Sequence, residues 1–251
     1  MNLGISGRVA FISGSTRGIG RAIAEMFHAE GCKVCISSRS SQDVNEVVSK
    51  LGERATGFSG NFQDPQICAD GIRHSIKIFG QLDILVCNLG GGRSVAPGHE
   101  TLEEWRRVMD LNFFSTTSLV SAARNDLAKS KGVIICISSI CGLATLGAPI
   151  TYSTAKAALN TFVRNMAFPL GQDGIRINAI APGNIVFPGS IWEKKLFEDE
   201  KAVKKMLANE VPLNTLGTPE DVASLATFLV SPRASFITGS VVVVDGGQLS
   251  F

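Results

Sequence analysis

Short apolar runs recur along the chain with helical stretches between them, and this alternation constrains the fold more than any other feature. Residues 133–137 read Val-Ile-Ile-Cys-Ile, and residues 241–244 read Val-Val-Val-Val. Runs that are apolar throughout, rather than at every second position, are typical of strands covered on both faces, as in a parallel sheet. We expect strands at residues 8–13, 33–38, 55–61, 82–88, 132–138, 176–181 and 240–245.

Helical patterns fill the intervals between these runs. Proline follows a capping residue at Asp64 and at Thr218, and Thr101 precedes Glu104 by three residues, which are start signals of helices. Because strands and helices alternate throughout, we expect an α/β fold: a single doubly wound, Rossmann-like domain over residues 1–251, with about seven parallel strands and helices on both faces. The helices are expected at residues 18–30, 41–51, 64–79, 101–129, 151–170 and 219–230.

Residues 184–215 interrupt the alternation. They follow the strand expected at residues 176–181, and open α/β sheets bind ligands at the carboxyl ends of their strands. A long excursion at such a place is typical of a lid, and the alternative is a surface helix pair with no role in binding. Phe187 and Trp192 would either face a substrate or pack within the lid.

Charge and hydropathy exclude several classes of partner. The chain has 24 Lys and Arg against 22 Asp and Glu, a net charge of +2, so we expect no nucleic-acid partner, which usually needs a basic stripe. No apolar run approaches the ~18–20 residues of a membrane span. Residues 1–7 lack the basic and apolar regions of a secretory signal, so we expect a soluble cytoplasmic protein without a membrane segment.

The six cysteines lie mostly within apolar runs, and we expect them to be free thiols in a reducing compartment. Cys32 and Cys35 form a CxxC pair, but the pair runs into a strand, where residues three apart point to opposite faces. No second CxxC pair or His pair at ligand spacing accompanies it, so we expect no metal site.

A glycine-rich turn follows the first expected strand and opens the first expected helix. Gly14, Gly18 and Gly20 would allow a tight turn, close approach of the backbone to a pyrophosphate and close packing of helix against strand. The amino end of the helix would offer free N–H groups and a partial positive charge to phosphates. The turn therefore predicts a dinucleotide site, and the alternative is a plain strand–helix connection.

The end of the second strand bears on the choice of cofactor. A carboxylate there would bind the adenosine ribose hydroxyls of NAD and repel a 2′-phosphate, whereas this chain has Ser38 followed by Arg39. Arg39 and Arg17 can converge on a phosphate with charge-assisted hydrogen bonds. We therefore expect NADP(H) in preference to NAD(H), unless both arginines simply face solvent.

Tyr152 is the only tyrosine of the chain, and Lys156 follows it by one helical turn, on the same helix face. A tyrosine has a pKa of about 10, and a neighbouring ammonium is expected to lower it. Such a phenol can exchange a proton with a substrate oxygen while a hydride moves to or from a nicotinamide. A serine at the end of the strand 132–138, either Ser138 or Ser139, would hold the same oxygen.

These motifs, in this order and spacing, resemble the short-chain dehydrogenase/reductase family, and its 3-oxoacyl-[acyl-carrier-protein] reductase-like members in particular. The resemblance runs from about residue 7 to 247 and covers the glycine-rich turn, Tyr152-x3-Lys156 and Ser139. It implies that Asn112 braces a water near the lysine, and that the enzyme is a homotetramer. It also implies a set of cofactor-binding residues, namely Gly14, Ser15, Arg17, Gly18, Ile19, Gly20, Ser38, Arg39, Asn61, Phe62, Asn88, Gly90, Tyr152, Lys156, Pro182, Gly183 and Ile185.

Three positions depart from the family pattern. Leu89 stands where the family has alanine, and Asn61 where it has an acidic residue that binds the adenine amino group. Phe187 stands near the position of a threonine that holds the carboxamide, so the Ile185 N–H would take over part of that task. None of these three residues belongs to the proton-transfer set.

The family resemblance implies an NADPH-dependent oxidoreductase that transfers a hydride between the nicotinamide and a carbonyl or secondary alcohol, such as a 3-oxoacyl thioester or a related ketone. The alternatives are an NAD-linked dehydrogenase of a sugar, polyol or steroid alcohol, and a nucleotide-binding regulator without turnover. A small-molecule pocket is expected between the loop after Gly90, residues 141–150 and residues 184–215. Arg93 or Lys194 would meet an acidic group of the substrate there.

Overall fold

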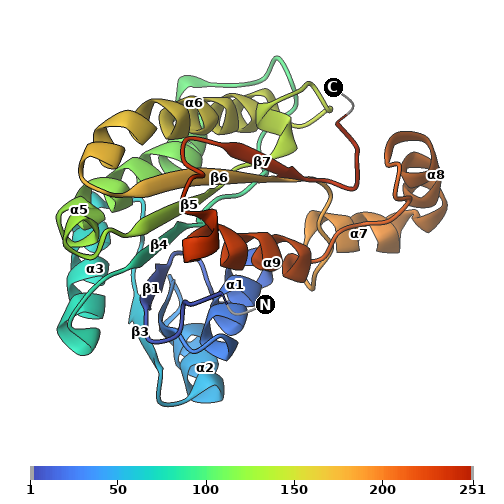
Figure 1. Cartoon of the computed structure of the whole chain (residues 1–251). Coiled ribbons are helices and arrows are strands. Elements are labelled where there is room, and N and C mark those ends of the chain that lie inside the picture. The colour runs from blue at the N-terminus through green and yellow to red at the C-terminus, as the bar shows by residue number, and fades with distance from the viewer. Residues whose placement is uncertain (1–2, 250–251) are drawn as a thin grey trace.

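Seven parallel strands form the centre of the protein in a computed structural model that describes residues 3–249. The strands are ordered β3-β2-β1-β4-β5-β6-β7, and each pairs with its neighbour in parallel (Figure 1). The sheet predicted from the apolar runs is thereby confirmed. The strands are β1 Val9–Ile12, β2 Lys33–Ser38, β3 Ala55–Ser59, β4 Ile84–Cys87, β5 Val133–Ile137, β6 Arg176–Pro182 and β7 Val241–Val244.

The direction of winding reverses at β1. The chain moves from β1 outward to β2 and β3, then crosses back to β4 on the other side of β1. At such a switch point the two outgoing turns part, and the carboxyl ends of the strands leave a crevice for a ligand. Residues 13–20 follow β1 and residues 88–92 follow β4, so both turns border that crevice.

Helices cover both faces of the sheet. Their bounds are α1 Gly18–Ala29, α2 Ser41–Leu51, α3 Pro65–Phe79, α4 Leu102–Met109, α5 Ser115–Ser130, α6 Ile150–Gln172, α7 Ile191–Glu198, α8 Glu200–Glu210 and α9 Pro219–Val230, with short 3-10 turns at Ile140–Gly142 and Pro232–Ala234. Successive residues of β1 point to opposite layers: Ala10 and Ile12 pack with α1, α2 and α9, whereas Phe11 packs with α3, α5 and α6. This arrangement buries every residue of β1, as a run apolar throughout requires.

The helix expected at residues 101–129 is interrupted. A π-helical segment, Asp110–Phe114, separates α4 from α5. Within it, the Asn112 Nδ2 donates a hydrogen bond to the Val108 carbonyl at 3.0 Å. A π segment adds a residue to the turn, and such segments are frequent at functional sites.

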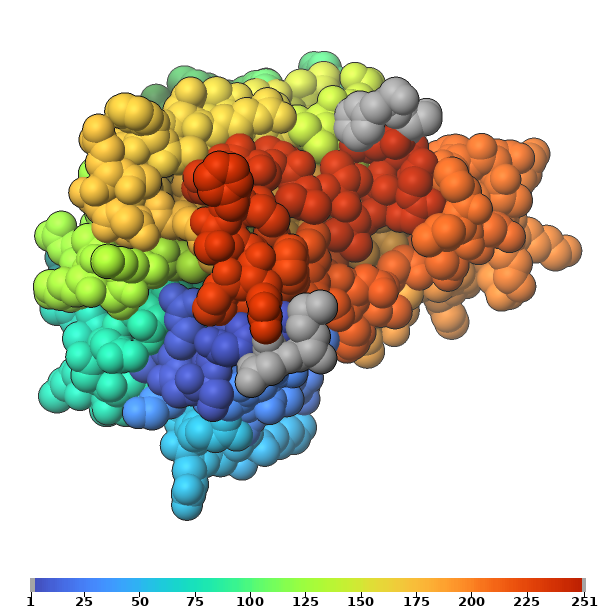
Figure 2. All heavy atoms as spheres, viewed as in Figure 1, coloured from blue at the N-terminus to red at the C-terminus, as the bar shows by residue number. Residues whose placement is uncertain are grey.

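The excursion after β6 contains α7 and α8. In Figures 1 and 2 this part of the chain projects from the body that the sheet and the other helices form. It has a small apolar cluster of its own, in which Val203, Leu207 and Val211 are buried and Trp192 packs against them. Trp192 thus packs within the excursion, which was one of the two roles expected for it.

Five of the six cysteines are buried free thiols, and Cys141 is half-buried. Cys32 packs with the layer of α1 and Cys35 with the layer of α3, so the CxxC pair faces opposite sides of the sheet. Within residues 3–249 we find no group of three or more His, Cys, Asp or Glu side chains placed to hold a metal ion. In the same part of the chain, every helix is too short or too polar to cross a membrane.

Candidate active site

The glycine-rich turn lies at the carboxyl end of β1, where α1 begins at Gly18. Gly14 and Gly18 have positive φ angles of 64° and 54°, which favour glycine. A Cβ on Gly20 would lie 2.5 Å from the Gly14 carbonyl oxygen and 2.4 Å from the Asn88 side chain, so only glycine fits. The residue before the helix, Arg17, makes no side-chain cap, which leaves the first N–H groups of α1 available to a phosphate.

Two serines fix this turn to its neighbours. The Ser15 Oγ donates to the Ile12 carbonyl at 2.8 Å and accepts from the Ser37 N–H at 2.9 Å. The buried Ser13 Oγ accepts from the N–H groups of Asn88 and Leu89 at 3.0 and 3.1 Å. Ser13 was not among the expected site residues, because its side chain joins segments that are 75 residues apart in the sequence.

Asn88 braces the turn from the end of β4. Its Nδ2 donates to the carbonyl oxygens of Ser13 and Gly14, at 3.0 and 2.9 Å. The amide therefore holds the two outgoing turns together across the crevice, and Leu89 stands directly beside Gly14.

The ends of β2 and β3 border the far end of the crevice. Arg17 and Arg39 are exposed, and within residues 3–249 neither guanidinium has a hydrogen-bond or ion-pair partner. Ser38 is half-buried and its hydroxyl donates to the Ser40 carbonyl at 3.2 Å. Asn61 is exposed, whereas the Phe62 ring lies in the core, 5.7 Å from the Phe11 ring, so Phe62 can reach a ligand only through its backbone.

Ser139, Tyr152 and Lys156 are brought together where β5 ends against α6. The Ser139 side chain lies close enough to the Tyr152 hydroxyl to lower the pKa of the phenol by hydrogen bonding. The Lys156 Nζ lies 5.8 Å from the centre of the Tyr152 ring and donates to the Ile137 carbonyl at 2.8 Å. Ser138 turns away, since its hydroxyl donates to the Asn160 side chain at 2.6 Å.

The pKa values of Tyr152 and Lys156 are both shifted by burial. Burial raises the pKa of Tyr152 to about 12, and the hydrogen bond from Ser139 opposes this only in part. Burial also lowers the pKa of Lys156 to about 8, because the ammonium loses most of its hydration where the side chain is 3% exposed. The pKa of Tyr152 is therefore raised and not lowered as expected, because desolvation is the largest effect on each group and favours the neutral form of both.

Asn112 braces the loop after β4 from the π segment. Its Oδ1 accepts from the Gly91 N–H at 2.9 Å, and its Nδ2 donates to the Gly91 carbonyl at 3.2 Å. A Cβ on Gly90 would lie 2.9 Å from this Oδ1 and 3.1 Å from the Lys156 Nζ, so Gly90 lies between the amide and the amine. The expected link from Asn112 to the lysine through water stays a prediction.

The turn after β6 closes the crevice on its other side. The Gly183 N–H donates to the Val244 carbonyl at 2.8 Å, which fixes the Pro182–Gly183 turn to β7. Ile185 is buried, and two residues further the Phe187 ring rests on the glycine-rich turn, 2.7 Å from the position of a Cβ on Gly18. This contact was not foreseen from the sequence, which suggested a substrate wall or lid packing for Phe187.

A cavity of about 910 Å³ opens between the loop after β4 and the start of α7. It is lined by Arg93, Gly189, Ser190, Ile191, Glu193, Lys194 and Phe197. A Cβ on Gly92 would lie 3.8 Å from Ile191 and 3.9 Å from the Tyr152 ring, so Gly92 lies between one lining residue of the cavity and the tyrosine.

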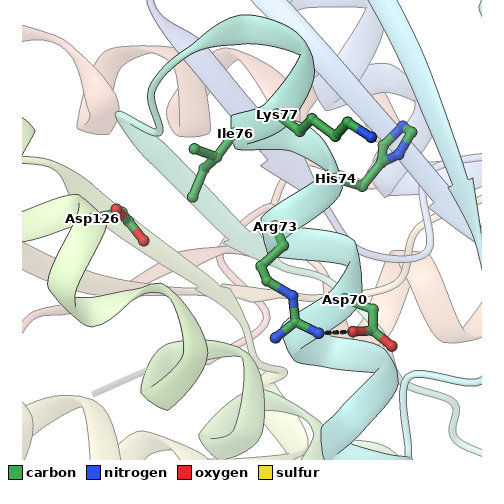
Figure 3. A pocket seen from close by; sticks show the side chains of 6 residues that line it. All are labelled: Asp70, Arg73, His74, Ile76, Lys77 and Asp126. Atoms are coloured by element: carbon green, nitrogen blue, oxygen red, sulfur yellow. Dashed lines mark hydrogen bonds and ion pairs between the residues drawn. The ribbon is translucent and has the colours of Figure 1, made fainter.

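A second cavity, of about 580 Å³, lies between α3 and α5 (Figure 3). Its lining is mixed in charge, with an ion pair between Arg73 and Asp70. None of the expected site residues lines it.

The arrangement suits a bound dinucleotide. Glycines stand where a side chain would fill the turn, and the first turn of α1 carries no acidic residue. Among the residues that the structure describes, the buried Lys156 amine donates a hydrogen bond to a backbone carbonyl and forms no ion pair. A Rossmann-like sheet that brings a tyrosine, a lysine and a serine together at the end of β5 is typical of an oxidoreductase that uses a nicotinamide nucleotide.

Comparison with known proteins identifies the family. The family model described as enoyl-(acyl carrier protein) reductase matches residues 14–248. Glucose 1-dehydrogenase 2 of Bacillus subtilis is 33% identical over 97% of this chain and 95% of its own length, and the 3-oxoacyl-[acyl-carrier-protein] reductase of Vibrio cholerae is 32% identical over 98% of this chain and 99% of its own. The structure of L-sorbose reductase from Gluconobacter frateurii, complexed with NADPH and L-sorbose, superposes with a TM-score of 0.94 at 31% identity over 100% of both chains.

The chain belongs to the short-chain dehydrogenase/reductase family. It is an NAD(P)-dependent oxidoreductase that acts on alcohol and ketone groups.

Proposed function

We propose that this enzyme reduces a ketone with NADPH and that Tyr152 supplies the proton. The observation that carries the proposal is the contact between the Tyr152 hydroxyl and Ser139, above a lysine held by the Ile137 carbonyl. When bound, the dinucleotide supplies a hydride to the carbonyl carbon. The phenol gives its proton to the carbonyl oxygen as the C=O bond becomes a secondary alcohol.

Each side chain has a distinct part in this step. Ser139 donates a hydrogen bond to the oxygen on which negative charge develops, and so stabilises the transition state. Lys156, when protonated, stabilises the phenolate that Tyr152 becomes after losing its proton. Because the pKa of Tyr152 is raised to about 12, the phenol holds its proton at neutral pH and is ready to act as the donor.

NADP(H) is the preferred cofactor in this proposal. The end of β2 has Ser38 in place of a carboxylate, and the exposed guanidinium groups of Arg17 and Arg39 are available to a 2′-phosphate. The related L-sorbose reductase was solved with NADPH. The residues that would hold the cofactor are Gly14, Ser15, Arg17, Gly18, Ile19, Gly20, Ser38, Arg39, Asn61, Phe62, Asn88, Gly90, Tyr152, Lys156, Pro182, Gly183 and Ile185.

The substrate is a 3-oxoacyl thioester or a related ketone, as the likeness to 3-oxoacyl-[acyl-carrier-protein] reductase suggests. The likeness to a glucose dehydrogenase supports a second candidate, the oxidation of a sugar or polyol alcohol. An NAD-linked steroid alcohol dehydrogenase is the remaining catalytic alternative. A regulator without turnover would have no need of the contact between Tyr152 and Ser139, which argues against that class.

The proposal also assigns a role to the excursion after β6 and an oligomeric state to the enzyme. α7 and α8 form a lid over the cavity beside Tyr152, and four copies of the chain form a homotetramer. The expected cytoplasmic location stays a prediction.

Fluorescence titration of the enzyme with NADPH and NADH, followed by turnover assays on a panel of ketones and alcohols, tests this function. We expect NADPH to bind at least tenfold more tightly than NADH and to be oxidised by one or more ketones. Tight binding of NADPH without turnover on any member of the panel would instead favour the regulator, and a preference for NADH with alcohol oxidation would favour the dehydrogenase.

A further inference from the structure

The cavity between the loop after β4 and α7 extends away from the reacting centre. Gly92 lies between the Tyr152 ring and Ile191, which is one of the residues that line the cavity: a Cβ on Gly92 would be in ordinary contact with both side chains, at 3.9 and 3.8 Å. A substrate whose carbonyl lies at the Tyr152 hydroxyl would therefore extend past Gly92 into the space lined by Arg93 and α7.

The backbone of Arg93 is fixed by hydrogen bonds to α4, whereas its guanidinium group has no partner among the described residues. The Arg107 guanidinium donates to the Arg93 carbonyl at 2.9 Å, and the Ser94 hydroxyl donates to Glu104 at 2.7 Å. Arg107 and Glu104 also form an ion pair at 2.7 Å, so the backbone of the loop is fixed to α4. Within residues 3–249, the Arg93 guanidinium has no acidic partner and no hydrogen-bond partner.

The α7 side of the cavity adds a second cation and an apolar surface. Lys194 lies 3.5 Å from Glu198, but this ion pair is exposed and contributes little. Glu193 is the one acid among the lining residues, and its carboxylate accepts the Gly189 N–H at 2.6 Å. Ile191 and Phe197 provide apolar surface next to these charges, and the Phe197 side chain is 93% exposed.

We propose that the substrate carries an anionic group at the end remote from its carbonyl, and that Arg93 and Lys194 bind this group. The inference rests on the proposed function and names the substrate class: an oxo compound with an apolar segment between the carbonyl and a carboxylate or phosphate. Arg93 and Lys194 outnumber Glu193 among the charged residues of the lining, and Ile191 of the same lining lies across Gly92 from the Tyr152 ring. Arg93 and Lys194 are specificity residues in this scheme, since neither reaches the reacting atoms.

A matched series of ketones tests the proposal. The probes are 4-oxopentanoate, 6-oxoheptanoate and 8-oxononanoate, each compared with its neutral methyl ester at saturating NADPH. A second arm compares 3-oxobutanoyl phosphopantetheine with the dephosphorylated pantetheine thioester, which separates a phosphate source of the anion from a carboxylate source. We expect an anionic form to exceed its neutral partner in kcat/KM by roughly tenfold, the effect of a charge-assisted hydrogen bond of ~1.5 kcal/mol.

The double variant Arg93→Gln/Lys194→Gln should abolish this preference by raising KM for the anionic probe about tenfold, with kcat and the rate on the neutral ester unchanged. The control is Arg106→Gln/Lys195→Gln, which removes the same charge from neighbouring positions outside the cavity lining; Lys195 lies 4.3 Å over the Trp192 ring. The control should keep the preference. Equal rates on acid and ester in the wild type, or a preference that survives the double variant, would overturn the proposal.

Calorimetric binding of the same acids and of phosphopantetheine separates this inference from the proposed function. If the wild type binds an anionic probe and the double variant does not, the proposed anion site is supported, and this holds even if the enzyme reduces no ketone. If ketones are reduced but no anionic probe binds more tightly than its neutral partner, the proposed function stands and the anion site is wrong.

Discussion

Burial determines the chemistry of the Tyr152–Lys156 pair. The spacing of the two residues predicts that they share a helix face, but their pKa values depend on how deeply β5 and α6 bury them. Lys156 is 3% exposed and its pKa falls to about 8, which places its loss of charge near physiological pH. The protonation state of the Lys156 amine therefore decides whether the phenolate that Tyr152 becomes after proton transfer is stabilised.

The pH dependence of ketone reduction follows from these values. Lys156 is charged below its pKa of about 8 and neutral above it, so kcat/KM should be flat at lower pH and fall about tenfold per pH unit above 8. Tyr152, with a pKa of about 12, remains protonated throughout this range. A kcat/KM profile from pH 6 to 10 measures this, and a profile that stays flat to pH 10 would show that the charge on Lys156 is not required.

We expect individual residues at the end of β2, Arg39 above all, to determine the preference between NADPH and NADH. Arg39→Asp should weaken NADPH binding by at least tenfold, because the new carboxylate repels the 2′-phosphate, and should strengthen NADH binding through the ribose hydroxyls. Titration with both cofactors measures the shift. An NADPH preference that survives the substitution would mean that Arg39 does not discriminate between the two.

At the scale of elements, the crevice depends on how closely the turns approach one another. The turns after β1 and β4 are joined by Ser13 and Asn88, and the Asn112 amide ties the loop after β4 to the π segment. These contacts leave space only for glycine at Gly20 and Gly90. The cofactor turn is therefore a packed arrangement of several elements.

Gly20→Ala should disrupt this arrangement. Its Cβ would lie 2.5 Å from the Gly14 carbonyl, so the turn must shift, and we expect a loss of about 1–3 kcal/mol in the free energy of unfolding together with at least tenfold weaker NADPH binding. Gly171→Ala, in α6 with open space around it, is the control and should change stability by no more than ~1 kcal/mol. Urea denaturation and NADPH titration of both variants measure the effects; normal binding by Gly20→Ala would contradict the geometry.

The strands were predictable because runs such as residues 133–137 are apolar at every position, which only a doubly covered sheet accommodates. The shared helix face of Tyr152 and Lys156 was predictable from their spacing, and the choice of Ser139 over Ser138 followed from the family resemblance. The π segment at Asp110–Phe114 was not predicted; Asn112 within it forms two hydrogen bonds with Gly91, 21 residues away, which no local sequence pattern encodes. The raised pKa of Tyr152 and the contact of Phe187 with Gly18 likewise depend on tertiary packing that no local pattern encodes.

For the whole molecule, exposed apolar side chains indicate where copies of the chain would meet. Phe168 of α6 is 76% exposed, Leu102 of α4 is 65% exposed, and Phe114 lies next to α5 at 49%. These helices contact one another through the π segment. Large exposed apolar side chains are typical of protein interfaces, so we expect these helices to form one.

We expect a native mass four times that of one chain in light scattering after size exclusion. Phe168→Glu should reduce the mass, because the carboxylate would be buried in the interface without a partner. Ile78→Glu, which alters an apolar side chain of α3 that is 52% exposed, is the control and should leave the mass unchanged. A monomeric wild type would contradict the tetramer.

Replacement of Tyr152 by phenylalanine, followed by parallel measurement of ketone reduction and NADPH binding, tests the central claim most directly. The ring remains while the proton donor is lost, so kcat should fall by about 10²–10⁴-fold with the dissociation constant of NADPH changed by less than about twofold. A variant that still reduces ketones at near the wild-type rate would show that another group donates the proton.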